Sequence, residues 1–171
     1  MSTDKIYLVG FMASGKSTVG RQLSHRLHWR AEDIDDLIET RERHTIADIF
    51  AKRGEPYFRS VERDTLKLLL PMRQLVVATG GGTFANPENR ATMMMDGTVV
   101  WIDLPLAELI PRIPLDGRRP LAADRAALER LYAARVDTYR LAHLRVNASR
   151  ASPGVVAERI LDAISQLGDL R

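Results

Sequence analysis

The sequence predicts an α/β protein in which a parallel β-sheet is covered by helices on both faces. Short apolar segments of strand length alternate along the chain with longer segments whose apolar residues recur every three or four positions. The segments 75–79 and 98–103 are apolar nearly throughout, as in strands that are buried on both faces. Helices that connect parallel strands cover the sheet, and its ligands collect beyond the carboxyl ends of the strands.

Composition and charge indicate a single globular domain over residues 1–171. Hydrophobic residues make up 45% of the chain and charged residues 27%, both ordinary for a globular domain. The net charge is +3 and the arginines are spread out, so no nucleic-acid partner is expected. No segment approaches the ~20 apolar residues of a membrane span, the first residues lack a signal-peptide pattern, and cysteine is absent. We expect a cytoplasmic monomer without a membrane partner.

The first predicted strand, 5–9, leads into a loop that binds phosphate in many proteins. It ends at Gly10, where the sequence matches G-x-x-x-x-G-K-[ST] and opens a helix over 16–27. Glycines allow successive N–H groups to face one anion, and the helix N-terminus adds positive charge. Lys16 can neutralise the outer phosphates and the Ser17 hydroxyl can bind Mg²⁺. A chance match is disfavoured because strand and helix flank the loop, so the motif predicts a nucleoside triphosphate site.

A weaker strand and three helical segments follow. The strand, 29–33, is less apolar than a buried parallel strand. Acidic residues then start a helix, Thr45 is the expected N-cap of the next one, and 54–56 breaks it. The helix 57–70 follows. Its inward positions by period are Phe58, Val61, Thr65 and Leu69.

Asp33 and Asp35 lie where the second strand ends and the helix starts. Acidic residues are common in a first helical turn, so capping is the plain explanation. Along an extended chain, however, the two carboxylates point to the same side, beyond the sheet. We favour a functional pair.

The second half of the chain continues the alternation. Its expected elements are a strand at 75–79, helices at 87–95 and from Pro105, a strand at 98–103, a loop at 113–123, a helix at 124–143, a strand at 144–147 and a terminal helix from Ser152.

Three further features of this half lie at strand ends or in the loop. Gly80-Gly81-Gly82 exceeds what a strand exit needs and indicates backbone amides close to a ligand. Loop arginines are usually solvated, but a mobile arginine such as Arg119 commonly meets the charge of a transferring phosphoryl group. Asp103 ends an apolar strand like the second acidic motif of phosphate-loop enzymes. The pattern alone does not decide between Asp103 and Asp33 as the metal ligand.

Over nearly its whole length the chain resembles the shikimate kinases, within the nucleoside-monophosphate-kinase-like group of phosphate-loop enzymes. The motifs that carry the resemblance are residues 10–18, Asp33-Ile34-Asp35, 46–50, Gly54-Glu55 with Phe58-Arg59 and Glu62, Gly80-Gly81-Gly82, Arg119-Pro120-Leu121, and Arg135 with Tyr139. The resemblance implies a three-layer P-loop kinase fold with a five-stranded parallel sheet in the order 2-3-1-4-5. It also implies a shikimate-binding region at about 33–62 and a lid at about 113–124.

The implied reaction transfers the γ-phosphate of ATP to the 3-hydroxyl of shikimate, with Mg²⁺, on the route to chorismate and the aromatic amino acids. The resemblance implies catalytic roles for Lys16, Asp35 and Arg119. It assigns Mg²⁺ to Ser17 and Asp33, and therefore implies that Asp33 and not Asp103 is the acidic metal ligand. The implied ATP ligands are Ala13, Ser14, Gly15, Lys16, Ser17, Thr18, Arg112, Arg119 and Pro153. The implied shikimate ligands are Asp35, Arg59, Gly80, Gly81, Gly82 and Arg135.

Some positions depart from the family pattern. Ala13 stands where the family often has glycine, His28 replaces another frequent glycine, and Pro111 and Pro114 alter the lid. A kinase of the same fold for another polyol acid, such as gluconate, is the alternative enzyme. A nucleotide-binding regulator would lack an equivalent of Asp35 or Arg119. A GTPase is disfavoured because the chain has no Asn-Lys-x-Asp sequence.

Overall fold

A computed structural model describes residues 4–113 and 124–168 and shows one five-stranded sheet within these ranges. Every neighbouring pair of strands is parallel. The strands lie in the order β2-β3-β1-β4-β5, which confirms the order implied by the resemblance. Their bounds are β1 Lys5–Val9, β2 Arg30–Asp33, β3 Leu75–Ala78, β4 Thr98–Asp103 and β5 Leu144–Asn147.

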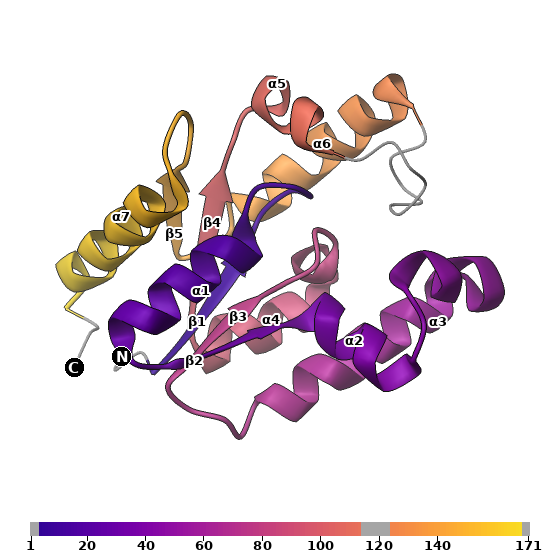
Figure 1. Cartoon of the computed structure of the whole chain (residues 1–171), viewed down its shortest axis with the longest axis horizontal. Helices are drawn as coiled ribbons and strands as arrows, with labels where there is room; N and C mark the ends of the chain where they lie inside the picture. The colour runs from indigo at the N-terminus through magenta and orange to yellow at the C-terminus, as the bar shows by residue number, and fades with distance from the viewer. Residues whose placement is uncertain (1–3, 114–123, 169–171) are drawn as a thin grey trace.

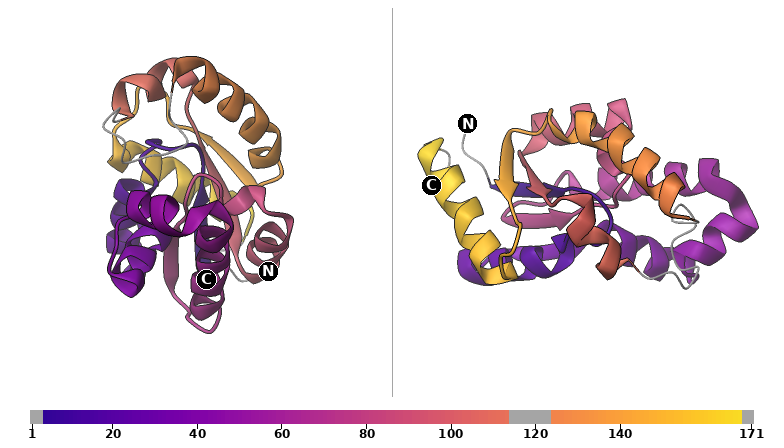
Figure 2. Two further views of the ribbon diagram at one scale, coloured as in Figure 1. Left: turned by 90° about the vertical axis from the view of Figure 1, so that its right-hand side faces the viewer. Right: turned by 90° about the horizontal axis from the view of Figure 1, so that it is seen from above.

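Helices cover both faces of the sheet, as the alternation of segments predicts. The helices are α1 Lys16–Leu27, α2 Ile34–Glu42, α3 Ile46–Leu69, α4 Pro87–Asp96, α5 Leu106–Leu109, α6 Arg125–Tyr139 and α7 Pro153–Gln166, with 3₁₀ turns η1 Thr83–Ala85 and η2 Ile110–Arg112. Helices α1 and α7 lie side by side on one face, and α3, α4 and α6 lie on the other (Figures 1 and 2). The result is a three-layer architecture.

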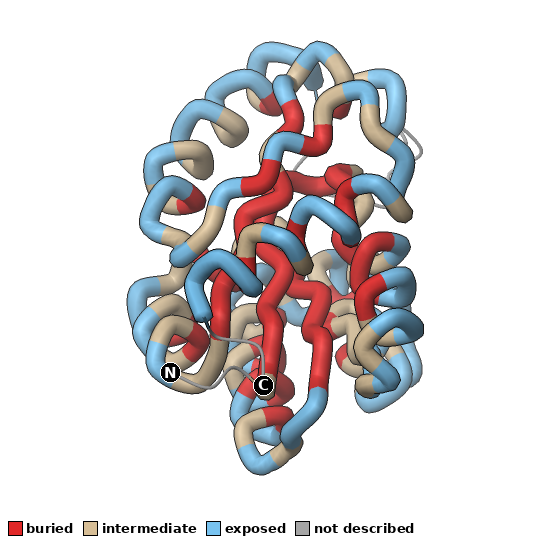
Figure 3. The backbone as a smooth tube through the Cα atoms, turned by 90° about the vertical axis from the view of Figure 1, so that its left-hand side faces the viewer, coloured by how far each residue is buried: buried red, intermediate tan, exposed pale blue. Residues whose placement is uncertain are grey.

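The core is centred on the three inner strands. All residues of β1 and β3 are buried, and so are the first five of β4. The outer strands β2 and β5 each pair on one side only and are partly exposed. Figure 3 shows this as continuous buried backbone through the middle of the molecule, with exposed backbone on the outer helices. Within the described ranges, no helix has the length and hydropathy needed to span a membrane.

Helix α3 contains a kink at the break that the sequence predicts. Gly54 has φ 79° and ψ 168°, a conformation that side chains with a Cβ rarely adopt. The Thr45 hydroxyl caps the first segment by accepting from the Asp48 amide at 3.1 Å. Across the kink, the Phe50 ring lies 4.8 Å from the Phe58 ring, so the kink folds the first segment back onto the second. Figure 1 shows α2 and the first segment of α3 extending beyond the sheet. The four inward positions predicted for the second segment are buried.

Some element bounds differ from the expected ones. Helix α6 ends at Tyr139, where a longer helix, to His143, was expected. The chain turns there through hydrogen bonds from the amides of Leu141 and Ala142, and the imidazole of His143 accepts from the Val99 amide at 3.0 Å. The ring therefore binds β4 from outside the helix. The expected lid, 113–124, lies outside the described residues except for its two ends.

A buried ionic network closes the amino ends of the strands. The ammonium of Lys5, whose side chain is fully buried, donates to the Asp96 carboxylate at 2.6 Å and to the carbonyls of Leu69 and Leu70 at 2.8 and 3.0 Å. The Tyr7 hydroxyl also donates to Asp96, at 2.5 Å. The network therefore connects β1 with the carboxyl ends of α3 and α4.

Candidate active site

The loop between β1 and α1 has the backbone that the phosphate-binding motif predicts. A Cβ at Gly10 would lie 2.7 Å from the carbonyl oxygen of Ile102, so β4 leaves no room for a side chain there. Gly15, at the helix start, has φ 88°. Ala13 has φ 62°, a left-handed conformation that glycine adopts without strain. This conformation gives the physical reason why a glycine is often found at that position.

The Lys16 side chain is folded over this loop. It is 8% exposed, and its ammonium donates to the carbonyls of Gly10 and Phe11 at 2.9 and 2.8 Å. The helix N-terminus and the ammonium thus place positive charge at one point beyond the end of β1. Of the other expected nucleotide contacts in the loop, Ser14 is buried and Thr18 is exposed on α1.

Ser17 and Asp33 meet between α1 and β2. The Ser17 hydroxyl donates to one carboxylate oxygen of Asp33, while the other accepts from the Asp35 amide at 2.9 Å and caps α2. A hydroxyl and a carboxylate beside a phosphate site are the oxygen ligands that Mg²⁺ takes from proteins, together with water and phosphate. The rival residue, Asp103, instead binds Arg145 of β5 through two hydrogen bonds of 2.9 and 2.7 Å. The residues around Ser17 therefore fit a magnesium ion.

Asp35, in the first turn of α2, approaches the chain at Gly80, Gly81 and Gly82, which form the turn after β3 and are called the glycine turn below. A Cβ at Gly80 would lie 3.0 Å from an Asp35 carboxylate oxygen and 3.1 Å from one of Glu62, so glycine allows both acids to approach the backbone. Asp35 lies in the first turn of α2, whereas Asp33, the N-cap residue before that helix, has an extended backbone. The expectation that the two lie on one extended chain is wrong, although both occupy this end of the sheet.

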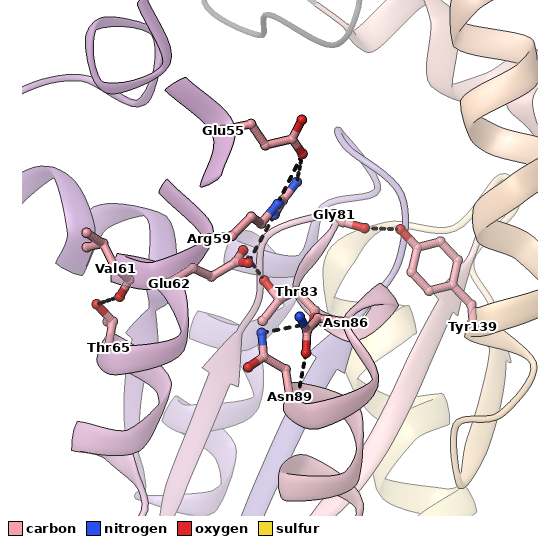
Figure 4. Close-up of polar contacts among 10 residues, drawn as sticks. All are labelled: Glu55, Arg59, Val61, Glu62, Thr65, Gly81, Thr83, Asn86, Asn89 and Tyr139. Carbon is pink, nitrogen blue, oxygen red and sulfur yellow. Dashed lines mark hydrogen bonds and ion pairs between the residues drawn. The ribbon is translucent and has the colours of Figure 1, made fainter. Parts of the chain in front are cut away.

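The guanidinium of Arg59 is held by two carboxylates on its own helix. It donates to Glu55 at 3.1 Å and to the fully buried Glu62 at 3.0 Å (Figure 4). Glu62 also accepts from the Thr83 hydroxyl at 2.6 Å. Burial alone would lower the pKa of Arg59, but the two carboxylates outweigh it and raise this pKa. A Cβ at Gly82 would lie only 2.6 Å from the guanidinium, so the glycine backbone forms the wall against which Arg59 rests.

Tyr139 approaches the same glycine turn from α6 on the opposite side. Its hydroxyl donates to the Gly81 carbonyl at 2.5 Å (Figure 4). The centroid of its ring lies 6.0 Å from that of Trp101. Burial raises the pKa of Tyr139, while the charges of Arg135 and Arg59 act in the opposite direction. The two arginines, from α6 and α3, are thus both close enough to influence one hydroxyl. The structure places Arg59 against Gly82, and it places Arg135 on α6 one helical turn before Tyr139, whose hydroxyl contacts Gly81.

The expected adenine contacts lie in η2 and at the start of α7. Arg112 is exposed in η2, and Pro153 is the exposed first residue of α7. Glu108 connects the two segments by accepting from the Ser149 hydroxyl and, at 3.1 Å, from the Arg150 amide. These hydrogen bonds, with the charges of Arg112 and Arg150, lower the pKa of Glu108. Glu108, four residues before Arg112 in the sequence, is therefore bonded to the segment that leads into α7. Arg119 lies outside the described residues.

Three residues of the site received no role from the sequence. Glu62 and Tyr139 belong to motifs of the resemblance, and Tyr139 follows Arg135 by four residues, a spacing that shares one helix face. That spacing could have placed Tyr139 at the site. Thr83 carries no comparable signal, because its contact with Glu62 exists only once α3 and η1 pack together.

Comparisons with known proteins agree on one family. A family model described as "Shikimate kinase" matches residues 12–165. The shikimate kinase of Sulfurihydrogenibium sp. is 43% identical over 162 residues, with 94% of this chain and 98% of the relative covered. The structure of the shikimate kinase from Acinetobacter baumannii in complex with shikimate has a TM-score of 0.92 and 35% identity, and covers 96% of this chain and 94% of that one. A gluconokinase from Sinorhizobium meliloti, at 13% identity, a TM-score of 0.58 and 98% and 95% coverage, shares the fold alone.

Proposed function

The chain belongs to the shikimate kinase family, and from this premise we propose which of its residues carry out the transfer of the ATP γ-phosphate to shikimate. It is a kinase of the phosphate-loop class, and its product belongs to the synthesis of chorismate and the aromatic amino acids. The observation that carries the residue assignment is the packing of Arg59, from α3, against Gly82 in the turn beside the phosphate loop, with Tyr139 of the helix that carries Arg135 bonded to Gly81 of the same turn.

The nucleotide binds with its phosphates against the backbone of residues 13–18. Lys16 neutralises the outer phosphates, and the N-terminal turn of α1 donates N–H groups to them. Ser17 and Asp33 would hold Mg²⁺, which would neutralise phosphate charge when bound. The adenine lies between Arg112 and the segment that leads into α7 at Pro153. The hydrogen bonds that join Glu108 of α5 to Ser149 and Arg150 support this placement.

Shikimate binds in the region 33–62 and against the glycine turn. The planar guanidinium groups of Arg59 and Arg135 bind its carboxylate, which suits two parallel N–H donors. Amides of the turn from Gly80 to Gly82 donate to the substrate from the short distance that glycine permits. Asp35 accepts a hydrogen bond from the 3-hydroxyl and orients its oxygen toward the γ-phosphate.

Transfer then depends on positioning and on charge neutralisation. Asp35 takes up the proton of the attacking hydroxyl, and Lys16 stabilises the charge on the transferring phosphoryl group. Arg119, in the proposed lid at 113–124, is assigned to neutralise the remaining negative charge on the equatorial oxygens of that phosphoryl group. Closure of this segment excludes water, which would otherwise compete with shikimate for the phosphate. We assign this work to one domain over residues 1–171, which acts as a monomer in the cytoplasm.

The proposal is tested by a coupled assay of ADP release with ATP, Mg²⁺ and either shikimate or gluconate. We expect turnover that depends on shikimate and on Mg²⁺. Turnover with gluconate but not with shikimate would contradict the assigned substrate. Monomer mass in solution is measured on the same sample by light scattering.

The substitution Lys16→Met tests the nucleotide assignment. We expect a loss of at least about 100-fold in kcat, because a charge aimed at the transition state is removed. The matched control is Lys67→Met, the same substitution at an exposed position of α3. Near-normal turnover of the folded Lys16→Met variant would remove Lys16 from catalysis.

A further inference from the structure

The carbonyl groups of the glycine turn are all held by hydrogen bonds. The Gly80 carbonyl accepts from the Thr83 amide at 3.2 Å, and the Gly82 carbonyl accepts from the Ala85 amide at 3.1 Å. Both partners are within three residues along the chain. The carbonyl between them, at Gly81, accepts from the Tyr139 hydroxyl on α6. Its orientation therefore depends on a side chain from a distant element.

This dependence matters because glycine restricts its own backbone least of all residues. Within a trans peptide the carbonyl and the following N–H point in opposite directions. A hydroxyl that holds the Gly81 carbonyl toward α6 thus turns the Gly82 N–H away from α6, toward the side occupied by Arg59. Gly81 also packs closely on the phosphate loop, since a Cβ there would lie 3.3 Å from the Met12 nitrogen.

Tyr139 itself is rigidly placed. It is 1% exposed, its ring packs on Trp101, and it shares a helix face with Arg135 one turn earlier. The hydroxyl stays protonated across the range of an enzyme assay, because burial raises its pKa. It therefore remains a donor to Gly81 under all such conditions.

We propose that Tyr139 is a positioning residue for the acceptor substrate, which fixes the Gly81–Gly82 peptide so that the turn presents its N–H groups on the side occupied by Arg59. This role rests on the proposed function, because it concerns the site assigned to shikimate. Tyr139 does not touch the substrate; it acts through the glycine backbone.

The test is Tyr139→Phe, which keeps the ring and removes only the hydroxyl. We expect KM for shikimate to rise about 3- to 10-fold, the effect of one lost hydrogen bond, with kcat and KM for ATP unchanged. A raised KM with an unchanged kcat indicates the loss of an interaction that stabilises the bound substrate and the transition state equally. The dissociation constant of shikimate, measured by calorimetry, is expected to rise by the same factor.

The matched control is Tyr132→Phe, on the same helix, whose hydroxyl donates to the Leu104 carbonyl at 3.0 Å. It removes the same kind of bond away from the glycine turn, so we expect KM for shikimate to stay unchanged. An equal rise in both variants would assign the effect to the packing of α6 and overturn the proposal. Wild-type kinetics in Tyr139→Phe, with only a lower melting temperature, would overturn it too.

A second measurement needs no variant. In the wild-type enzyme without shikimate, NMR order parameters of the Gly81 and Gly82 amides are expected near the rigid-backbone value of about 0.85. Values below about 0.6 that rise on addition of shikimate would show that the substrate orders the turn, against the proposal. If the wild-type enzyme neither binds nor phosphorylates shikimate, the proposed function fails instead.

Discussion

Arg59 has its position set by its own helix and by the backbone of a distant turn. The two carboxylates on α3 hold the guanidinium from one side, and Gly82 lies against it on the other. Its side chain is 20% exposed, so the charge is largely withdrawn from water before any substrate arrives. A cation that is already desolvated and oriented loses little freedom on binding a carboxylate. The buried Glu62 is what makes that arrangement stable.

Gly82→Ala tests this placement at the scale of one methyl group. The added Cβ would lie 2.6 Å from a guanidinium nitrogen, so the Arg59 guanidinium must shift away from the turn. We expect KM for shikimate to rise about ten-fold or more, since a charged hydrogen bond contributes roughly 1.5–3 kcal/mol. Steady-state kinetics at varied shikimate measure it. Gly20→Ala is the control, because its Cβ would make an ordinary contact of 3.5 Å with Leu8. Unchanged KM in Gly82→Ala would show that Arg59 has room to adjust.

At the scale of elements, local patterns predicted more than the contacts between elements did. The apolar segments became the buried strands, and the motif at Gly10 identified the phosphate loop by itself. The order of the strands came from the family resemblance, because periodicity does not say which strands pair. Arg59 and Arg135 also came from the resemblance, since an arginine on a helix carries no local sign of its partner. The Glu62–Thr83 contact was beyond reach for a related reason: it joins α3 to η1 only in the folded chain.

The kink in α3 is the element on which the acceptor region depends. Gly54 allows the segment that carries Phe50 to fold back over Phe58, one residue before Arg59. A straight helix would separate Phe50 from Phe58 by more than two turns. The Glu42 carboxylate accepts a hydrogen bond from the Tyr57 hydroxyl at 2.8 Å, and this bond connects α2 to the second segment of α3.

Gly54→Ala is therefore expected to destabilise the protein by about 1–3 kcal/mol, because alanine is strained at φ 79° and ψ 168°. The free energy of unfolding in urea measures this. The space around the site is open, with Pro56 as the nearest neighbour at 3.7 Å, so the cost arises from the backbone and not from a clash. A stability equal to that of the wild type would mean that the helix can rearrange around the substitution.

At the scale of the whole molecule, the two ends of the sheet have different roles: one carries the candidate site and the other a stabilising ionic network. The carboxyl ends carry the phosphate loop, the acids and the glycine turn. The amino ends carry the network of Lys5, Tyr7 and Asp96, which joins β1 to α3 and α4 away from the site. Burial alone would raise the pKa of Asp96, but hydrogen bonds from Lys5, Tyr7 and Arg73 outweigh it and lower this pKa below its ordinary value.

This shift predicts how stability depends on pH. The folded protein binds the Asp96 proton less readily than the unfolded chain, so the stabilisation is complete above about pH 4 and is lost as the pH falls through the lower, folded value. We expect Asp96→Asn to lose about 3 kcal/mol at pH 7, because Lys5 stays buried without its counter-charge, and to lose less on further acidification than the wild type. Urea unfolding at several pH values measures both effects.

The control is Asp137→Asn, which removes an exposed ion pair with Arg140 and is expected to change stability little at any pH. If Asp96→Asn and the wild type fell in parallel on acidification, the acid sensitivity would originate elsewhere in the protein.

The strand order also affects how this chain emerges from the ribosome. The central strand β1 is made early, yet its two neighbours are contributed by residues 75–78 and 98–101. One edge of β1 therefore has no native partner until residue 78 of the 171 has been synthesised, and the other has none until residue 101. Unpaired apolar strands of this kind aggregate readily, so we expect the partly synthesised chain to be prone to aggregation until both partner strands are available.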